Sequence, residues 1–503
     1  MTTHNFFASL LAAALLLSPS ACLPAPPQGS DPGQYSRSGA TSGSSGADSP
    51  GPPGASGSLR GPAALRGFNP SSPLSLQSTV IPPEDFELGP GQSLDPKLGV
   101  YIDLSKVKNP QPIRGGTTAS TDPGPRTEAY DRLNSDIFAP PGTDSGDVPN
   151  AKWPLGLSHN RLGLKSSGWA RQQNVNQMPV AKAMAGVDMR LEPNAYRELH
   201  WHKQNEWALV LNGSVRIASM EQNGQSFIDD LQEGDVWFFP AGEPHSIQAL
   251  ANGCEFLLIF DDGTFSEDNT FLVSELFERN PLEVLAKNFR TNVDAFKNLP
   301  KGELYIFPGT PAPANISEQN STGPAGSIPM EQSYSYHLSK QEPYRVPGGT
   351  VKIIDPKSFP IAKNFAAALF TVEPGAMREL HWHTTSDEWT YFISGQGRVT
   401  VYDAPEASAT FDFSAGDVGY VPVPFSHYIE NTGTEPLVYL EVLLADAYQD
   451  VSVAQWLGLT PAQVVKDHLG VDDEFIAKLP KTKQFILPGN KDLLETDFSG
   501  EQL

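Results

Sequence analysis

The sequence predicts an all-β protein made of two tandem copies of one barrel or sandwich domain, each followed by a helical extension. Three observations predict it. A long stretch of the chain occurs twice, each copy alternates short β-type runs with turns, and each copy carries the same set of three histidines and one glutamate. The chain has 503 residues, which is enough for two or three domains and a sizeable core.

The duplication covers whole domains. The segment "MPVAKAMAGVDMRLEPNAYRELHWH" (178–202) aligns without a gap with "FPIAKNFAAALFTVEPGAMRELHWH" (359–383), and "EGDVWFFPAGEPHSI" (233–247) aligns with "AGDVGYVPVPFSHYI" (415–429). The tails also match, since "LPKGELYIFPG" recurs as "LPKTKQFILPG". Because the repeat is far longer than the unit of a solenoid, we interpret it as two domains in tandem.

Within each copy, local patterns predict the elements. Runs such as "GSVRIASM", "DVWFFP" and "EFLLIF" are rich in β-forming residues and are separated by turn dipeptides, which predicts an antiparallel sandwich or barrel. Segments 270–298 and 452–479 have helical spacing and form the predicted extensions. Asn212-Gly213 predicts a hairpin turn, and the Pro/Ser/Asn-rich stretch 308–329 is the predicted linker.

The predicted domains are therefore 96–320 and 321–503. Ahead of them, residues 1–21 are predicted to be a secretory signal peptide, because the apolar run 6–17 is too short to span a bilayer and is followed by small residues. Residues 22–95 are rich in Pro, Gly and Ser with few large apolar residues, which predicts a disordered leader or pro-segment.

A secretory signal implies a secreted, extracellular protein. Its candidate glycosylation sites are the sequons at Asn212, Asn315 and Asn320. Of the two cysteines, Cys22 lies at the predicted cleavage point, and Cys254 lies in the apolar run "CEFLLIF", where we expect a buried, inert thiol. We therefore expect neither a structural disulfide nor a metal–thiolate site.

The charge balance excludes some partners. The chain has 58 acidic and 35 basic residues and a net charge of -23, which argues against nucleic acid or an anionic membrane surface as a partner. It suits a soluble protein that works in acid, where many carboxylates are neutral. No later stretch has the length and apolarity of a transmembrane helix.

The string "RELHWH" places two imidazoles on one face of a strand. Residues i and i+2 of a strand point to the same side, so His200 and His202 project together while Trp201 points away. Glu206 can return to that side after a slight bend, and His245 is the natural fourth group if the sheet closes into a barrel. Such a set suits Mn, Fe, Cu, Ni or Zn, and a six-coordinate ion would keep two positions open for a substrate or dioxygen.

The second copy offers an equivalent set with one more residue before its glutamate. Its members are His381, His383, Glu388 and His427. The alternative is that these histidines are hydrogen-bonded core residues without a ligand. The chain has 10 histidines, and six of them fall in two matching sets, each with its glutamate, which favours metal ligands.

These residues resemble the two motif blocks of the cupin superfamily. In the second copy the match comprises Gly375, His381, His383, Glu388 and Gly395, then Gly416, Pro422, His427 and Asn431, with Pro424 in place of a glycine. In the first copy it comprises His200, His202, Glu206, Gly213, Gly234, Pro240, Gly242 and His245, with Asn194 in place of the opening glycine and Ala249 in place of the closing asparagine. Because asparagine tolerates a positive φ, the change at Asn194 need not disturb the turn.

Over most of residues 160–503 the chain resembles the bicupin oxalate decarboxylases. The resemblance rests on "RELHWH" twice, "SFIDDLQEGDVWFFPAGEPHSIQAL", "FLLIFDDGTFSEDNTF" and "VGYVPVPFSHYIEN". It implies two jelly-roll β-barrel cupin domains, one Mn²⁺ in each barrel and thus two per chain, and oxalate as a small-molecule substrate that is split into formate and CO2 with dioxygen as co-catalyst. It also implies that the helical extensions pack the chain into a homo-oligomer, a trimer or hexamer.

The resemblance also implies roles for two arginines and one acid. Arg197 and Arg378 stand three residues before the first histidine of their copies, and the family places this arginine in the pocket, where a guanidinium suits a carboxylate. Strict alternation would point both away from the metal, so they reach it only across a bend or bulge, and a surface salt bridge is the alternative. The stretch "SEDNT" (266–270) resembles the family's lid, and Glu267 falls at its catalytic acid, the proton donor.

The second copy has "LLADAYQDVSV" at this place and no matching lid glutamate. It has instead Glu441, within the apolar run "LVYLEVLLAD", where the same count from His245 reaches Ile259 in the first copy. Two interpretations stay open for Glu441, a second catalytic acid or a structural charge pair for Arg378. We expect the first centre to carry most of the turnover, while the second metal is catalytic, supports electron transfer or stabilises the fold.

Two other functions use the same residues. An oxalate oxidase would make CO2 and H2O2 with the same metal ligands, and Glu267 argues against it because proton return to carbon is the step that yields formate. A non-enzymatic, storage-type bicupin would be expected to have lost metal ligands, whereas both sets are complete here.

Overall fold

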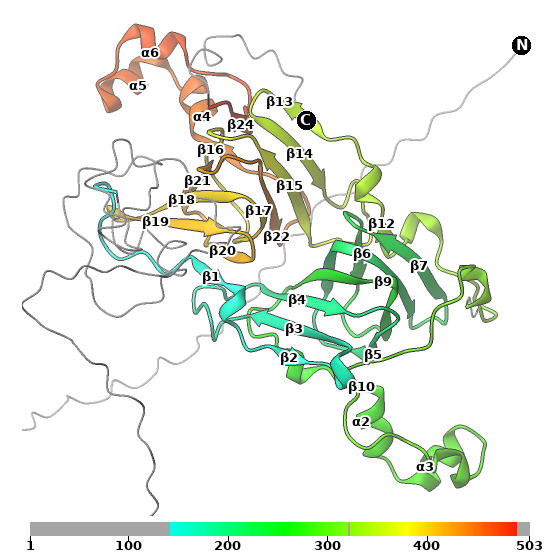
Figure 1. Ribbon diagram of the computed structural model, residues 1–503. Coiled ribbons are helices and arrows are strands. Elements are labelled where there is room, and N and C mark those ends of the chain that lie inside the picture. The colour runs from blue at the N-terminus through cyan, green and yellow to red at the C-terminus, as the bar shows by residue number, and fades with distance from the viewer. Residues whose placement is uncertain (1–140, 320–321, 490–503) are drawn as a thin grey trace, which may run out of the picture. The chain divides into compact units, whose positions relative to one another are not determined.

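The computed structural model describes residues 141–319 and 322–489 (Figure 1). The predicted signal peptide, the leader and Asn320 lie outside the described residues. The described part of the chain forms β-barrels with short helices, so the predicted all-β fold with tandem barrels and helical extensions is confirmed.

The first barrel is built around β6 and β9, the two long strands that carry Glu206 and His245. Its strands are β2 (Arg161–Leu162), β3 (Gly168–Gln173), β4 (Ala185–Leu191), β5 (Tyr196–Trp201), β6 (Glu206–Met220), β7 (Ser226–Gln232), β8 (Val236–Phe239), β9 (His245–Phe260), β10 (Phe271–Leu272), β11 (Ile306–Phe307) and β12 (Ser335–Tyr336). The strand order is β12-β8-β6-β9-β4-β3-β2, with β7 on β6 and with β5 paired to β9, β10 and β11.

The second barrel consists of two sheets, ordered β1-β20-β17-β22-β15-β14-β13 and β19-β18-β21-β16-β23, with β24 on β16. Its strands are β1 (Lys152–Pro154), β13 (Tyr344–Val346), β14 (Gly349–Ile354), β15 (Ala366–Val372), β16 (Met377–Trp382), β17 (Glu388–Ser394), β18 (Gln396–Asp403), β19 (Ala407–Ser414), β20 (Asp417–Val421), β21 (Ser426–Asn431), β22 (Leu437–Leu443), β23 (Val451–Ser452) and β24 (Ile486–Leu487). The core between the sheets includes Phe370, Phe392, Val399, Ile429 and Tyr439.

Two turn predictions had different outcomes. Asn194 has φ 66 and Gly375 has φ 75, so the asparagine does take the positive φ of the motif's opening glycine. The hairpin predicted at Asn212-Gly213 is wrong, because β6 runs through both residues. Gly213, with φ 77, lies at a bulge where the pairing of β6 with β9 changes register, so the strand bends instead of reversing.

Each barrel takes an edge strand from the segment that precedes the other barrel. Strand β1 precedes the first barrel but pairs with β20 of the second, and β12 follows the first helical extension and pairs with β8. The barrels also share a core, in which the Trp389 ring packs on Gly186 so closely that a Cβ there would lie 2.2 Å from a ring atom. The indole Nε1 donates to Gln173 Oε1 at 2.8 Å. These contacts tie the two barrels together across a long sequence separation.

The helical extensions follow β10 and β23 as predicted. They comprise α2 (Val273–Glu278) and α3 (Leu282–Asn288) after the first barrel, and α4 (Val453–Leu459), α5 (Ala462–Leu469) and α6 (Asp473–Ala477) after the second (Figure 1). The Glu198 carboxylate accepts hydrogen bonds from Ser274 N at 2.7 Å and Tyr305 N at 2.9 Å. Glu198 therefore holds both ends of the first extension against β5, the strand that carries His200 and leads directly into His202.

Two further expectations, about the cysteine and about membrane-spanning helices, can be compared with the described residues. Cys254 is buried without a disulfide partner there, and burial raises the pKa of its thiol to about 12, as expected of an inert cysteine. In that part of the chain, no helix has the length and apolar character needed to cross a membrane.

Candidate metal centres

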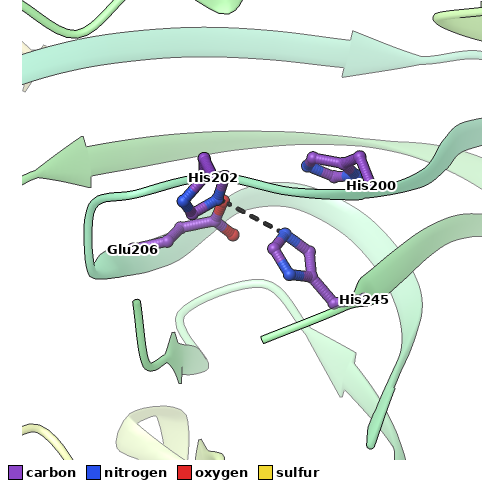
Figure 2. Close-up of side chains that lie close together, drawn as sticks. All are labelled: His200, His202, Glu206 and His245. Atoms are coloured by element: carbon purple, nitrogen blue, oxygen red, sulfur yellow. Dashed lines mark hydrogen bonds and ion pairs between the residues drawn. The ribbon is translucent and has the colours of Figure 1, made fainter. Parts of the chain in front are cut away.

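The first candidate centre gathers four side chains from β5, β6, β9 and the turn after β5. His200 lies on β5, His202 follows that strand, Glu206 begins β6 and His245 begins β9, and Figure 2 shows the four side chains together inside the barrel. Their ligand atoms all lie within 4.8 Å of one another, and all four side chains are buried. The expected i, i+2 projection of the two strand histidines and the return of the glutamate therefore occur together.

Backbone carbonyls orient each imidazole of this centre. The Nδ1–H groups donate to Glu198 O at 2.6 Å from His200, to Gln204 O at 2.8 Å from His202 and to Glu243 O at 2.8 Å from His245. A carbonyl can only accept, so each ring carries its proton on Nδ1 and turns the Nε2 lone pair inward. This is the tautomer that a metal ligand needs.

The Glu206 carboxylate is held between the histidines and an indole. Its Oε2 lies 3.1 Å from His202 Nε2 and 3.6 Å from His245 Nε2, while Oε1 accepts from Trp237 Nε1 at 2.8 Å. The distance to His245 is too long for a hydrogen bond, and its Nε2 has no other hydrogen-bond partner among the described residues. A buried, unpaired lone pair facing a carboxylate is the arrangement expected when a cation completes the site.

The second candidate centre repeats this arrangement with His381, His383, Glu388 and His427. Glu388 Oε2 lies 2.9 Å from the Nε2 atoms of both His383 and His427, and 3.9 Å from that of His381. The His381 Nε2 atom lacks a hydrogen-bond partner in the described ranges. The glutamate is oriented differently here, because Thr390 Oγ1 donates to its Oε1 at 2.6 Å in place of an indole.

The surroundings of His200 and Glu206 favour a neutral imidazole and an ionised carboxylate, the forms that bind a metal ion. Burial, and then the positive charge of Arg197, lower the pKa of His200 well below its usual value, so the ring stays neutral. Burial alone would raise the pKa of Glu206, but the proximity of His202 and His245 outweighs it and holds the pKa below the usual range. Three neutral imidazoles and one carboxylate fit a divalent first-row metal ion in each barrel.

Comparison with known proteins agrees with this geometry. The Cupin family model matches residues 159–295 and 336–477, one match per barrel. The oxalate decarboxylase OxdC of Bacillus subtilis is 47% identical over 374 residues, which cover 74% of this chain and 96% of that protein. An oxalate decarboxylase of Arthroderma benhamiae is 38% identical over 75% of this chain and 93% of its own length.

The chain belongs to the bicupin oxalate decarboxylase family. Solved structures of the Bacillus subtilis enzyme support the assignment. One described at pH 4.6 has a TM-score of 0.71 at 46% identity and covers 76% of this chain and 98% of its own. Another, with the same score and identity, is described by the Mn(II) centres of that enzyme.

Arg197 and Glu267, the arginine and the acid singled out from the sequence of the first copy, contact each other. The pairing of β5 with β9 shifts register between Arg197 and His200, so the bulge that the arginine requires is present. Arg197 is 1% exposed, and its Nη2 lies 3.2 Å from Glu267 Oε2 on a single 3-10 turn at Glu267–Asn269. Both side chains are therefore buried together, although 70 residues separate them in sequence.

Two neighbours of this pair were not singled out from the sequence. Arg197 Nη2 also donates to Thr270 Oγ1 at 3.1 Å, and its guanidinium lies over the Tyr305 ring at 4.5 Å from the centroid. The Tyr305 hydroxyl is buried and has no hydrogen-bond partner in the described part of the chain. A comparison of the two repeated tails could have pointed to Tyr305, because the tails differ at this position. Tyr305 of "ELYIF" stands where the second copy has Phe485 of "KQFIL".

The second centre has a different set of neighbours. Arg378 is fully buried and reaches Asp450 Oδ2 at 2.6 Å through Nη2, while its Nε lies 3.7 Å from Glu441 Oε1. The Tyr448 hydroxyl donates to the other oxygen of Glu441. Burial, and then the charge of Glu388, raise the pKa of Glu441 above its usual value. Glu441 therefore lies near both Arg378 and the metal ligands, and both interpretations of it remain predictions.

The structural counterpart of Glu441 differs from the one obtained by counting. Glu441 pairs with Thr390 on β17 and Ala368 on β15, and the residue with the same neighbours in the first barrel is Leu258, not Ile259. The count failed because the connection between β21 and β22 contains one residue more than the corresponding bend of β9. An aliphatic residue stands there in either case, so the first centre has no acid at this position.

Proposed function

We propose that this chain is a manganese-dependent oxalate decarboxylase that converts oxalate into formate and CO2, with dioxygen as co-catalyst and with the first centre as the main site of turnover. One observation carries the assignment to the first centre. Arg197 and Arg378 each have a buried Nη1 without a hydrogen-bond partner among the described residues, but the guanidinium of Arg197 contacts the buried acid Glu267, whereas that of Arg378 contacts Asp450.

The metal would be held by His200, His202, Glu206 and His245 in the first barrel and by His381, His383, Glu388 and His427 in the second. The unpaired Nε2 atoms of His245 and His381 support this, because neither has a use in the absence of a cation. When bound, manganese supplies one-electron redox chemistry at open positions that accept oxalate and dioxygen, which weakens the carbon–carbon bond.

Arg197 would bind and orient the substrate. A guanidinium presents paired N–H donors in the geometry of a carboxylate, and Nη1 is the donor left available while Nη2 is held by Thr270. The stacking of this guanidinium on Tyr305 restricts its rotation, so the donor points in one direction. Lys at this position would keep the charge but lose the paired geometry.

Glu267 would move the proton that the reaction needs. When the carbon–carbon bond of hydrogen oxalate breaks, CO2 leaves with one carbon, and the other carbon must gain a proton to become formate. Glu267 would return that proton to carbon from its carboxyl oxygen, so atoms and charge balance without net oxidation. A buried position on the lid segment 266–270 would also exclude water from the site while this happens.

The test supplies oxalate to the manganese-loaded protein under air and assays formate, CO2, H2O2 and bound metal together. A decarboxylase yields formate and CO2 in equal amounts, with no dioxygen consumed overall but with turnover falling when dioxygen is removed. Peroxide as the main product would support an oxalate oxidase instead. A protein that binds no metal would support a storage-type bicupin.

The proposal extends to the assembly. Large apolar side chains remain exposed on both helical extensions, which is unusual for a surface without a partner. They include Leu276, Leu282, Val284 and Phe289 in the first extension and Trp456, Leu459, Val464 and Leu469 in the second. Such faces suit contact with further copies of the chain, as a trimer or hexamer, and light scattering on the purified protein distinguishes these from a monomer.

The proposal also includes secretion and glycosylation. Asn212 and Asn315 are exposed, as acceptors of a glycan must be. Mass spectrometry of protein recovered from a secreting host would show whether residues 1–21 are removed and whether these two sites carry sugar.

A further inference from the structure

The two barrels differ in what neutralises their arginines. In the first, the carboxylate paired with Arg197 within the described residues belongs to Glu267, on the lid segment 266–270. In the second, three carboxylates surround Arg378. They belong to Asp450 at 2.6 Å, Glu441 at 3.7 Å and Glu379 at 3.9 Å.

Strand pairing identifies the residue that causes this difference in charge around the two arginines. Strand β10 starts at Phe271, which pairs with Trp201, and β23 starts at Val451, which pairs with Trp382. The residues immediately before these strands therefore correspond to each other, and they are Thr270 and Asp450. Both contact Nη2 of the arginine in their own barrel, Thr270 with a neutral hydroxyl and Asp450 with a carboxylate.

Asp450 cannot move aside as the lid segment could. Its side chain is 0% exposed, and the next residue begins β23. The Lys483 ammonium also contacts Asp450 Oδ1 and lies 3.6 Å from Glu379, so Asp450 bridges the buried guanidinium of Arg378 and a partly buried ammonium. Removing its carboxylate from this position would leave both cations without their nearest counter-charge.

We propose that Asp450 is a specificity-determining residue that withholds Arg378 from external carboxylates, so that only the first centre accepts oxalate as a bidentate, charge-matched ligand. This inference rests on the proposed function. At the first centre, opening of the lid segment removes the acid paired with Arg197 and leaves a guanidinium for the substrate. At the second, Nη1 of Arg378 also lacks a hydrogen-bond partner in the described ranges, but a buried carboxylate that the fold holds in place already balances the charge of the guanidinium. The negative charge of an oxalate there would face Asp450 and Glu441.

The direct test measures binding without turnover. A His200→Ala/His202→Ala chain loaded with manganese holds the metal in the second barrel alone, and the EPR spectrum of Mn(II) reports ligands that arrive there. Without dioxygen, we expect titration with oxalate to leave this spectrum unchanged while Asp450 is present. Asp450→Asn keeps the shape of the side chain and removes its charge. With this substitution added, we expect the spectrum to change and saturate, because the second barrel binds oxalate at least about tenfold more tightly than it does with Asp450.

Other results would overturn the inference. Equal responses with and without Asp450→Asn would show that Asp450 does not govern access. A response to Glu441→Gln alone, with none to Asp450→Asn alone, would assign the role to Glu441 and exclude Asp450 as the determinant. Metal content measured on each sample separates loss of binding from loss of manganese.

The reciprocal substitution tests the same idea in the other barrel and does not depend on the folding of the Asp450 variant. Thr270→Asp should give Arg197 a permanent counter-charge and raise the KM for oxalate by about tenfold or more relative to Thr270→Asn, with a smaller effect on kcat. Equal KM values for the two variants contradict the inference. Failure of the proposed function is a distinct result, because the unsubstituted chain would then make no formate.

Discussion

The Gln172 side chain holds Glu267 in place from β3. Its Oε1 accepts a hydrogen bond from the backbone N–H of Glu267 at 3.0 Å, and its Nε2 donates to Ser266 Oγ at 3.3 Å. Both contacts are made to the lid segment 266–270, and neither touches the acid's carboxyl group. The conformation that buries Glu267 against Arg197 therefore depends on a glutamine that lies outside both motif blocks.

Gln172→Ala should loosen the lid segment. With two hydrogen bonds lost, the buried conformation is destabilised by about 1–3 kcal/mol, and we expect formate production to fall while the peroxide fraction rises. The measurement is the ratio of formate to peroxide at saturating oxalate. Gln222→Ala, at an exposed glutamine between β6 and β7, is the matched control and should leave the ratio unchanged. An unaltered ratio in Gln172→Ala would show that these contacts do not govern the lid segment.

Glu267→Gln tests the proton donor while keeping the side chain's size. Loss of a positioned general acid should lower formate production by about 10²–10⁴-fold and shift the product towards CO2 and peroxide. Asp268→Asn is the control, since Asp268 lies on the same turn but is 72% exposed and pairs with Arg161 at 3.1 Å. A surface ion pair of this kind should change the rate by less than about fivefold. Formate produced at the original rate by Glu267→Gln would exclude this glutamate as the donor.

Removing one glutamate ligand at a time should separate the two centres. Glu206→Ala and Glu388→Ala each delete the carboxylate that contacts the histidines of one set, so manganese per chain should fall by about half in either variant. We expect Glu206→Ala to abolish formate production and Glu388→Ala to retain it. Metal analysis and the formate assay on the same samples give the answer. Activity that survives Glu206→Ala would place turnover in the second barrel.

The buried carboxyl group of Asp188 should make the stability of the fold depend on pH. It is buried on β4, where Tyr391 of the second barrel donates to its Oδ2 at 3.2 Å. Burial, and then the nearby charge of Glu255, raise the pKa of Asp188 to about 7, although Arg171 opposes the shift. The folded chain therefore keeps a proton that the unfolded chain loses near pH 4. The resulting stability is fully present below that pH and is lost as pH rises towards 7, by up to about 4 kcal/mol.

Asp188→Asn provides the check, because an amide has the same shape and does not titrate in this range. The free energy of unfolding should fall with pH between about 4 and 7 in the original chain and much less in the variant. Denaturant unfolding at several pH values measures both. Parallel curves for the two proteins would show that Asp188 does not cause the dependence.

Local rules determined much of this protein. Alternation along a strand put His200 and His202 on one face, and the repeat predicted two barrels with equivalent metal sets. Turn dipeptides such as Gly234-Asp235 marked strand ends, although Asn212-Gly213 did not. Each of these follows from the spacing of neighbouring residues, which the backbone converts directly into geometry. The same period of two also indicated that Arg197 needs a bulge, and β5 has one.

Contacts between distant segments could not be predicted in this way. The exchange of β1 and β12 between the barrels, the hold of Gln172 on the lid segment and the place of Tyr305 beside Arg197 all join residues that no local period relates. Counting failed for the same reason when it matched Glu441 with Ile259, because an additional residue in a connection shifts the count but leaves the strand pairing unchanged.

The sequence by itself determined which residues form the two metal sets, because those residues lie in short, repeated, strand-length motifs. Only the tertiary structure decided which side chains meet the arginine beside each set. Thr270 and Asp450 stand in unlike local sequences, and nothing relates them until β10 and β23 pair with the same position of their barrels. The charge that each arginine meets is a property of side chains brought together by folding, and it makes two nearly identical strings part of two different sites.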